Sequence, residues 1–229
     1  MELINPYNFS LLKSVDNKLV DDSGTVFPKI RGVIRIVDGS NYTDNFGFQW
    51  NKFQKTQIDR EKKDCLISKI RFFAETNWDP LSLKNQNLLE VGCGAGRFSQ
   101  VVLSNTKANL YSIDFSSAVE ANYRNNKEYK NRIQIFQASI YAMPFQNNSF
   151  DKVFCLGVLQ HTPNFKLSIE SLSEKVSTGG ELVIDFYPVN GWWTKINAKY
   201  ILRPWLKRVD HKKLFSLIEK NIDWMITLY

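Results

Sequence analysis

The chain has 229 residues, of which 43% are hydrophobic and 23% are charged, and its formal net charge is +7. This length can bury the core of one full α/β domain and leaves room for an additional arm. The sequence contains no apolar run near the roughly 18 residues that a membrane span requires, and no signal-peptide core, so we expect a cytoplasmic protein.

Residues 1–60 form the first predicted unit, an N-terminal arm. Short β-rich runs at 18–20 and 26–37, separated by turn residues, predict one or two hairpins. In the aromatic stretch that follows, the step from Asn45 to Gly47 predicts a turn. The spacing of apolar residues between positions 57 and 76 then predicts a helix.

From Asn87 onward the sequence alternates short strands with longer helices. Strands are expected at 88–91, 110–114, 133–137, 152–156 and 181–186, and helices at 96–104, 117–129 and 165–176. Strands and helices that alternate through short loops favour a parallel sheet with helices on both faces. We therefore predict a Rossmann-like α/β core over residues 61–190.

A glycine-rich loop follows the first core strand, in the sequence Leu88-Leu-Glu-Val-Gly-Cys-Gly-Ala-Gly-Arg-Phe-Ser99. A dinucleotide site has a third small residue at the position that Arg97 occupies here. Glu90 would repel a diphosphate but suits a ligand that carries an ammonium group. A P-loop is excluded because no Gly-Lys-Ser/Thr sequence follows. These features favour S-adenosylmethionine, which has an ammonium group and a sulfonium but no phosphate.

The loop resembles the first motif of class I S-adenosylmethionine-dependent methyltransferases of the small-molecule, type 11-like subgroup. The resemblance continues through Tyr111-Ser-Ile-Asp114, Ala142-Met-Pro-Phe145, Ser149-Phe-Asp151 and Val158-Leu-Gln-His-Thr-Pro163. It covers approximately residues 87–187, with the motifs in the family's order and spacing. It implies the family's fold and S-adenosylmethionine as the cofactor.

Several residues are candidates for cofactor binding in that fold. Asp114 ends the second core strand and is expected to accept the ribose hydroxyls, although it could instead cap the following helix. The family has an aspartate for the adenine amino group where this chain has Ser139, so the backbone of Ile140 and apolar walls such as Met143 are expected to compensate. The other candidates that the resemblance implies are Glu90, Gly92, Cys93, Gly94, Phe115, Leu156 and Gly157.

His161 is the candidate catalytic residue, because it follows the fourth core strand where the transferred methyl group is expected. A histidine there could deprotonate an acceptor hydroxyl or amine. The alternative is a loop histidine that only shapes the pocket. Transfer to a good nucleophile needs little more than alignment of donor and acceptor.

The arm shows a second resemblance, over residues 26–37 and 46–50, to the zinc-ribbon-derived arms of some bacterial methyltransferases. Those arms often carry cysteines where this chain has Asp21 and Asp22, so we expect no metal. Gln49 and Trp50, with Tyr42, are expected either to cover the cofactor or simply to pack the arm on the core. The three cysteines, Cys65, Cys93 and Cys155, are predicted to be reduced thiols.

Residues 191–229 form a basic, aromatic tail, and an excess of six positive charges lies between Trp192 and Lys213. The alternatives for this tail are an amphipathic helix packed on the domain, a substrate lid, and peripheral membrane contact through 192–208. The family's last two strands lack a counterpart apart from a candidate edge strand at 224–229. An open sheet edge invites pairing, so we expect a homodimer or a domain that is weak alone.

The leading functional hypothesis is transfer of a methyl group from S-adenosylmethionine to an oxygen, nitrogen or carbon of a small molecule or of a glycan or lipid precursor. The first alternative is a non-catalytic module that binds S-adenosylmethionine or a partner through a degenerate methyltransferase fold. The second is an RNA methyltransferase. The sequence has no dedicated RNA-binding motif and its charge is confined to one segment, so nucleic acid is expected to be an unlikely partner.

Overall fold

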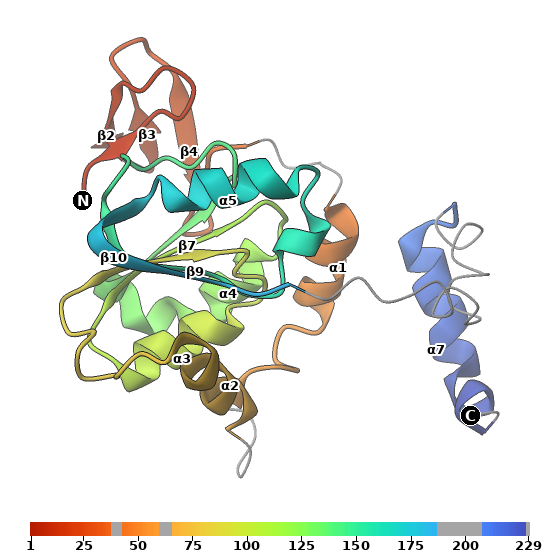
Figure 1. Ribbon diagram of the computed structural model, residues 1–229. Coiled ribbons are helices and arrows are strands. Elements are labelled where there is room, and N and C mark those ends of the chain that lie inside the picture. The colour runs from red at the N-terminus through yellow and green to blue at the C-terminus, as the bar shows by residue number, and fades with distance from the viewer. Residues whose placement is uncertain (38–42, 60–65, 187–207, 228–229) are drawn as a thin grey trace. The chain divides into compact units, whose positions relative to one another are not determined.

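The computed structural model describes residues 1–37, 43–59, 66–186 and 208–227. The chain divides into two compact units, Met1–Phe186 and Tyr187–Tyr229. The first unit therefore contains both the arm and the core that the sequence separates. In the second unit the structure describes one helix, α7 (His211–Thr227), and Figure 1 shows the elements of both units.

A ten-stranded sheet organises the first unit, in the order β1-β2-β3-β4-β5-β8-β7-β6-β9-β10. The arm supplies β1 (Leu3–Ile4), β2 (Leu11–Val15), β3 (Lys18–Val20), β4 (Val26–Ile30) and β5 (Val33–Arg35). The core supplies β6 (Asn87–Val91), β7 (Asn109–Asp114), β8 (Ile133–Gln137), β9 (Phe150–Cys155) and β10 (Val176–Ile184). All four pairings among the core strands are parallel, which confirms the predicted α/β fold.

Helices lie on both faces of the core strands (Figure 1). One face carries α2 (Ile67–Thr76), α3 (Arg97–Asn105) and α4 (Val119–Asn126), and the other carries α5 (Phe165–Ser173). Two 3-10 helices, η2 (Lys127–Arg132) and η3 (Leu159–His161), follow α4 and β9. Helix α1 (Asp44–Lys52) belongs to the arm.

The first core strand shows why these layers form. Successive side chains of a strand point to opposite faces, and Leu88 and Leu89 are both fully buried but belong to different apolar clusters. Leu88 belongs to the cluster that includes Phe72 of α2, and Leu89 to the cluster that includes Leu172 of α5. A strand that is apolar on both faces must be covered by helices on both sides, as the sequence predicted.

The arm is continuous with the core sheet, which the sequence did not predict. Its strands pair antiparallel from β1 to β5, and β5 then pairs parallel with β8, with Ile34 opposite Phe136. Leu19 and Phe27 of the arm belong to the same apolar cluster as Phe136. The predicted hairpins therefore exist, but they extend the sheet at its β8 edge.

Two local predictions are wrong. The step from Asn45 to Gly47 lies inside α1 and does not form a turn. Gly47 packs so closely on Ser117 that a Cβ there would lie 2.3 Å from the Ser117 Oγ, so a tertiary contact overrides the weak helix propensity. Residues 224–227 belong to α7 and not to an edge strand.

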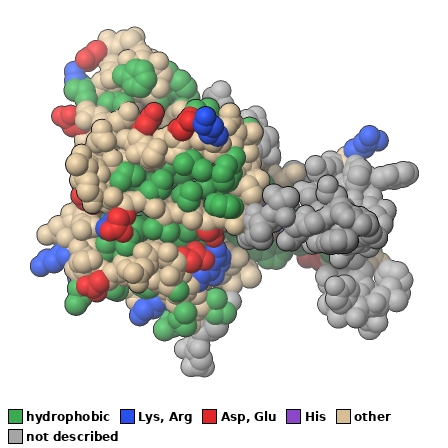
Figure 2. Space-filling view, in the orientation of Figure 1, with side chains coloured by type: hydrophobic (Ala, Val, Ile, Leu, Met, Phe, Trp, Pro, Cys, Tyr) green, Lys and Arg blue, Asp and Glu red, His purple; other side chains and the backbone are tan. Residues whose placement is uncertain are grey.

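In the part of the chain that the structure describes, β10 pairs only with β9, and no strand follows it. Figure 2 shows hydrophobic side chains gathered in the region of α5 and β10, and Phe165, Leu167 and Phe186 are exposed there. None of the helices in the described residues has the length and apolar content of a membrane span. Residues 192–207 of the predicted tail helix, Tyr42 and Cys65 lie outside the described residues.

Candidate cofactor site

The loop between β6 and α3 has the backbone that only glycine adopts easily. Gly92, Gly94 and Gly96 have φ angles of 80°, 50° and 85°. A Cβ on Gly92 would lie 2.2 Å from a methyl carbon of Val158, and a Cβ on Gly96 would lie 2.4 Å from the Asn122 Oδ1. The first and third glycines are therefore required by packing as well as by φ.

Gly94 differs from its two neighbours, because the nearest atom to a Cβ there would be the Nε1 of Trp50, at 3.6 Å. The core does not crowd this position, so its backbone can approach a ligand. By contrast, the Cys93 side chain is buried in the apolar cluster that includes Phe98. The Cys93 N–H donates to the Ile113 carbonyl at 3.0 Å, so in this loop Gly94 offers the accessible surface.

Asp114 lies directly beside this loop, at the end of β7. Its Oδ2 accepts the Gly94 N–H at 2.8 Å, and its Oδ1 accepts the N–H and the hydroxyl of Ser116 at 2.8 and 2.7 Å. It does not cap α4, whose N-cap is Ala118. Burial raises the pKa of Asp114 above its ordinary value. A carboxylate has about four acceptor positions, so Oδ2 retains one for a ligand hydroxyl.

Glu90 lies deeper than Asp114, with an exposed fraction of 2%. Its Oε2 accepts the Ser112 hydroxyl at 2.7 Å and also the Ser99 hydroxyl of α3. The Asn122 side chain donates to the same Ser99 oxygen at 2.9 Å. Burial raises the pKa of Glu90 to about 7. The structure thus places this carboxylate between the sheet and α3, in a hydrogen-bonded network beneath the loop.

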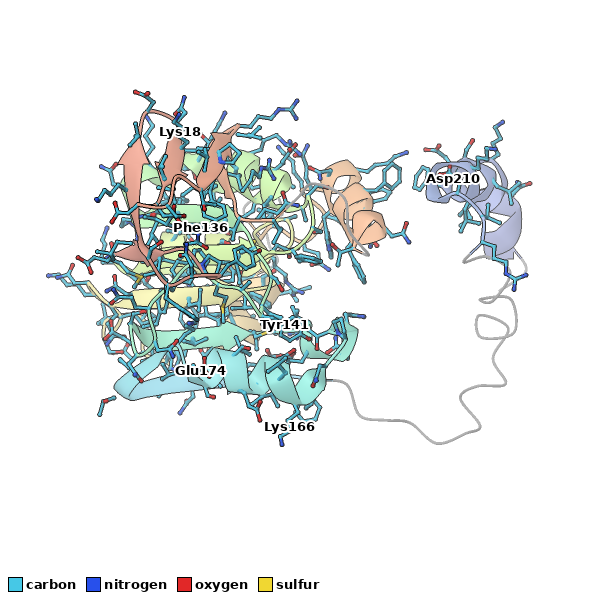
Figure 3. The ribbon with its side chains drawn as sticks, turned by 90° about the horizontal axis from the view of Figure 1, so that it is seen from above. Lys18, Phe136, Tyr141, Lys166, Glu174 and Asp210 are labelled. Atoms are coloured by element: carbon cyan, nitrogen blue, oxygen red, sulfur yellow. The ribbon has the colours of Figure 1, made fainter. Side chains whose placement is uncertain are left out.

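The candidates for adenine binding follow the ends of β7 and β8, which are neighbours in the sheet. Phe115 is half-buried, and its carbonyl accepts the Gln137 side-chain amide at 3.2 Å. The Ser139 hydroxyl accepts the Tyr141 N–H at 3.2 Å, and Ile140 is buried. Figure 3 labels Tyr141, whose hydroxyl accepts the backbone N–H of Asn164, just before α5.

The end of β9 leaves open space beside the loop. A Cβ on Gly157 would meet no atom within 4 Å, and the Gly157 N–H donates to the Asp185 carboxylate at the end of β10. Arg71 of α2 pairs with the same carboxylate at 2.6 Å. Leu156, just before Gly157, is buried in the core. Asp185 was not predicted as a site residue from the sequence. It lies at the end of the last core strand, as Asp114 lies at the end of the second.

His161 and Gln160 lie in η3, immediately after this open position. The exposed His161 ring contacts Phe46 of α1, with ring centroids 5.1 Å apart. Both polar atoms of the Gln160 amide are buried, and the described residues offer them no hydrogen-bond partner. Gln160 lies in the motif Val158–Pro163, but no role was predicted for it. That its amide is buried without a hydrogen-bond partner becomes evident only in the structure.

Helix α1 connects the two sides of this site. Its Phe46 contacts His161 of η3, and its Asn51 side chain donates to the Ser117 carbonyl, before α4, at 2.9 Å. Between them, Trp50 lies against Gly94. Gln49 is exposed. Trp50 therefore lies beside the loop, as both the predicted cover over the cofactor and simple packing of the arm on the core would require.

Replacing Trp50 with alanine should weaken binding of S-adenosylhomocysteine about fivefold, since an aromatic contact with a ligand contributes roughly 1 kcal/mol. Calorimetric titration measures the change. Phe9, an exposed aromatic residue of the arm, provides the control. If the Phe9→Ala protein loses as much affinity as the Trp50→Ala protein, the loss does not come from a contact of Trp50 with the ligand.

The arrangement fits S-adenosylmethionine. One accessible glycine backbone, one available carboxylate position and one open strand end lie along the same edge of the parallel sheet, where ligands of such folds bind. Among the described residues, no three His, Cys, Asp or Glu side chains are grouped to hold a metal.

Comparison with known proteins gives three findings. Residues 89–184 match a family described as "Methyltransferase domain". A tRNA U34 carboxymethyltransferase of Nautilia profundicola is 28% identical over 112 residues, which make up 48% of this chain and 37% of that protein. A protein of the same name from Alteromonas mediterranea is 30% identical over 132 residues, with shares of 52% and 39%. The matched part is thus about two fifths of each relative's length.

The fold has solved counterparts. A Methanococcus maripaludis protein described as an S-adenosyl-L-methionine-dependent methyltransferase superimposes with a TM-score of 0.52 at 17% identity, covering 83% of this chain and 78% of that one. The cyclase SpnF has a TM-score of 0.50 at 16% identity, with 64% and 60% covered. These likenesses concern the fold, which by itself does not determine the reaction.

The expectation that nucleic acid is an unlikely partner is wrong, because the curated relatives are named for tRNA. It depended on the lack of a linear RNA-binding motif and on the confinement of charge to one segment. Phosphate contacts need only suitably placed cations, and folding can bring these together from separate parts of a chain.

Proposed function

Because residues 89–184 belong to the class I S-adenosylmethionine-dependent methyltransferases, we propose that this chain carries the transferase centre of an enzyme that modifies tRNA. The transferred group is a methyl group or the carboxymethyl group named in the relatives, and the acceptor is the uridine at position 34 that those names specify. The small-molecule acceptor favoured by the sequence has no comparable support.

One observation supports the transferase centre most strongly. Gly94, Asp114 and Gly157 follow three adjacent strands of the parallel sheet, and each retains space or hydrogen-bonding capacity toward a ligand. A bound S-adenosylmethionine supplies an electrophilic carbon on its sulfonium. The chain's contribution is to hold the ribose at Asp114 and to leave the space at Gly157 for the acceptor.

Alignment of donor and acceptor supplies most of the rate enhancement in such a displacement. With the donor bound, the bond from the transferred carbon to sulfur would break as the bond to the acceptor forms, and the acceptor would lose a proton. His161 follows the strand end that opens at Gly157, so it is the candidate to take that proton. We expect α1 to limit the access of water, because its Trp50 lies against the loop at Gly94.

The proposal is tested by incubating the purified chain with a tRNA transcript that has uridine at position 34. The donor is S-adenosylmethionine in one reaction and a bacterial small-molecule extract in another. We expect the digested tRNA to contain a uridine with added mass, and that mass identifies the group. A transcript with cytidine at position 34 is the control. Unchanged tRNA in both reactions, from protein that binds S-adenosylhomocysteine, would contradict the proposal.

A further inference from the structure

A groove of about 780 Å³ lies between the arm and the core, away from the cofactor loop. One wall comes from the connected strands β4 and β5, with Lys29 and Gly32. The other comes from the second half of α4 and from η2, with Arg124, Lys127 and Lys130. Its base includes the first residues of β8. Segments about a hundred positions apart in the sequence therefore form one concavity.

The two walls are held together by specific contacts. Gly32 packs on Tyr123 so closely that a Cβ there would lie 2.2 Å from the tyrosine ring. Arg35 pairs with Glu120 of α4 at 2.9 Å, and Arg31 pairs with the same carboxylate at 3.1 Å. The groove is thus formed by the fold itself, and a ligand would not have to order it.

The charged lining is predominantly cationic. It contains Lys29, Arg124, Lys127 and Lys130, and Glu128 is its one carboxylate. The three lysines are exposed, and within the described residues none of them forms an ion pair. Lysines that gather on a concave surface and form no ion pair attract an extended anion.

The groove is also connected to the cofactor loop. Asn125 lines the groove, and its side-chain amide donates to the Ala95 carbonyl in the loop at 2.8 Å. Arg124 lines it too, and donates to the Asn51 side chain of α1 at 2.6 Å. The neighbouring residue Trp50 lies against Gly94. A ligand bound in the groove would be separated from the candidate cofactor site by one layer of side chains.

We propose that this groove binds the phosphodiester backbone of the RNA substrate, with Lys29, Lys127 and Lys130 as its phosphate contacts. This inference rests on the proposed function. A single phosphate would occupy only part of the volume and could not engage both walls. A membrane surface is a poorer fit because the cations line a concavity, whereas proteins that lie on membranes present a helix with an apolar face.

The test compares two double variants with the same change of charge. Lys127→Gln/Lys130→Gln removes two groove cations, and Lys84→Gln/Lys107→Gln removes two exposed cations outside it. Binding of the uridine-34 transcript is measured by fluorescence anisotropy over a series of salt concentrations. For the groove variant we expect the slope of log K against log salt to fall by about two, one for each phosphate that is no longer neutralised. The control variant should keep the wild-type slope.

Each outcome distinguishes this proposal from the proposed function. If wild-type protein binds and modifies the transcript but the two variants have equal slopes, the groove is not the RNA site and the proposed function stands. If wild-type protein binds S-adenosylhomocysteine but no tRNA, both proposals fail. If the groove variant loses binding to phosphatidylserine vesicles while its tRNA slope is unchanged, the groove serves a membrane and the RNA assignment is overturned.

Discussion

Replacing Asp114 with alanine is expected to weaken S-adenosylhomocysteine binding roughly 100-fold, because a hydrogen bond to a charged group contributes about 1.5–3 kcal/mol. The carboxylate has one acceptor position left for a ribose hydroxyl after it accepts Gly94 and Ser116. The same change releases the Gly94 N–H, which loosens the loop. Both effects act on affinity in the same direction. Isothermal titration calorimetry measures the change.

Two further variants show whether the effect belongs to the ligand. Asp114→Asn keeps the size of the side chain but removes its charge, and it should lose less affinity than Asp114→Ala. Ser116→Ala removes one internal partner of Asp114 and should leave affinity close to that of the wild type. Equal affinities for the wild-type and Asp114→Ala proteins would show that this carboxylate has only a structural role.

The second large effect concerns stability and pH. Burial raises the pKa of Glu90 from 4.5 to about 7, so the folded protein holds this proton more tightly than the unfolded chain. The contribution of Glu90 to stability is therefore complete below pH 4.5 and is lost as pH rises through about 7. The shift corresponds to roughly 3 kcal/mol.

The Glu90→Gln variant should not show this loss, because glutamine does not titrate. Its free energy of unfolding in urea is expected to be close to the wild-type value below pH 4.5 and higher above pH 7. Glu170 of α5 is exposed, so Glu170→Gln serves as the control and should follow the wild type throughout. Parallel curves for the wild-type and Glu90→Gln proteins across this interval would mean that Glu90 does not titrate there.

The features of the site that the sequence predicted depend on short stretches of chain. The loop from Gly92 to Gly96 follows a buried strand, and its φ angles are those that glycine favours. Asp114 was expected at the end of the second core strand, and its hydrogen bond from Gly94 joins it to the loop. The resemblance to class I methyltransferases, which rested on these motifs, is confirmed.

The features that were missed depend on contacts between distant segments. The pairing of Ile34 with Phe136 joins the arm to the core sheet. No local sequence pattern specifies which strand an edge strand pairs with. A turn was predicted at Gly47, but this residue packs on Ser117 and lies inside helix α1. Lys29 of the groove lies about a hundred positions before Lys127 and Lys130, so no single basic run in the sequence indicates this surface.

The central claim is that S-adenosylmethionine binds along the edge formed by Gly94, Asp114 and Gly157. A crystal structure with S-adenosylhomocysteine tests it most directly. We predict a ribose hydroxyl bonded to the Asp114 Oδ2, adenine near Ile140, and the sulfur facing the space beside Gly157. Density for the ligand elsewhere, or none at a saturating concentration, would contradict the account.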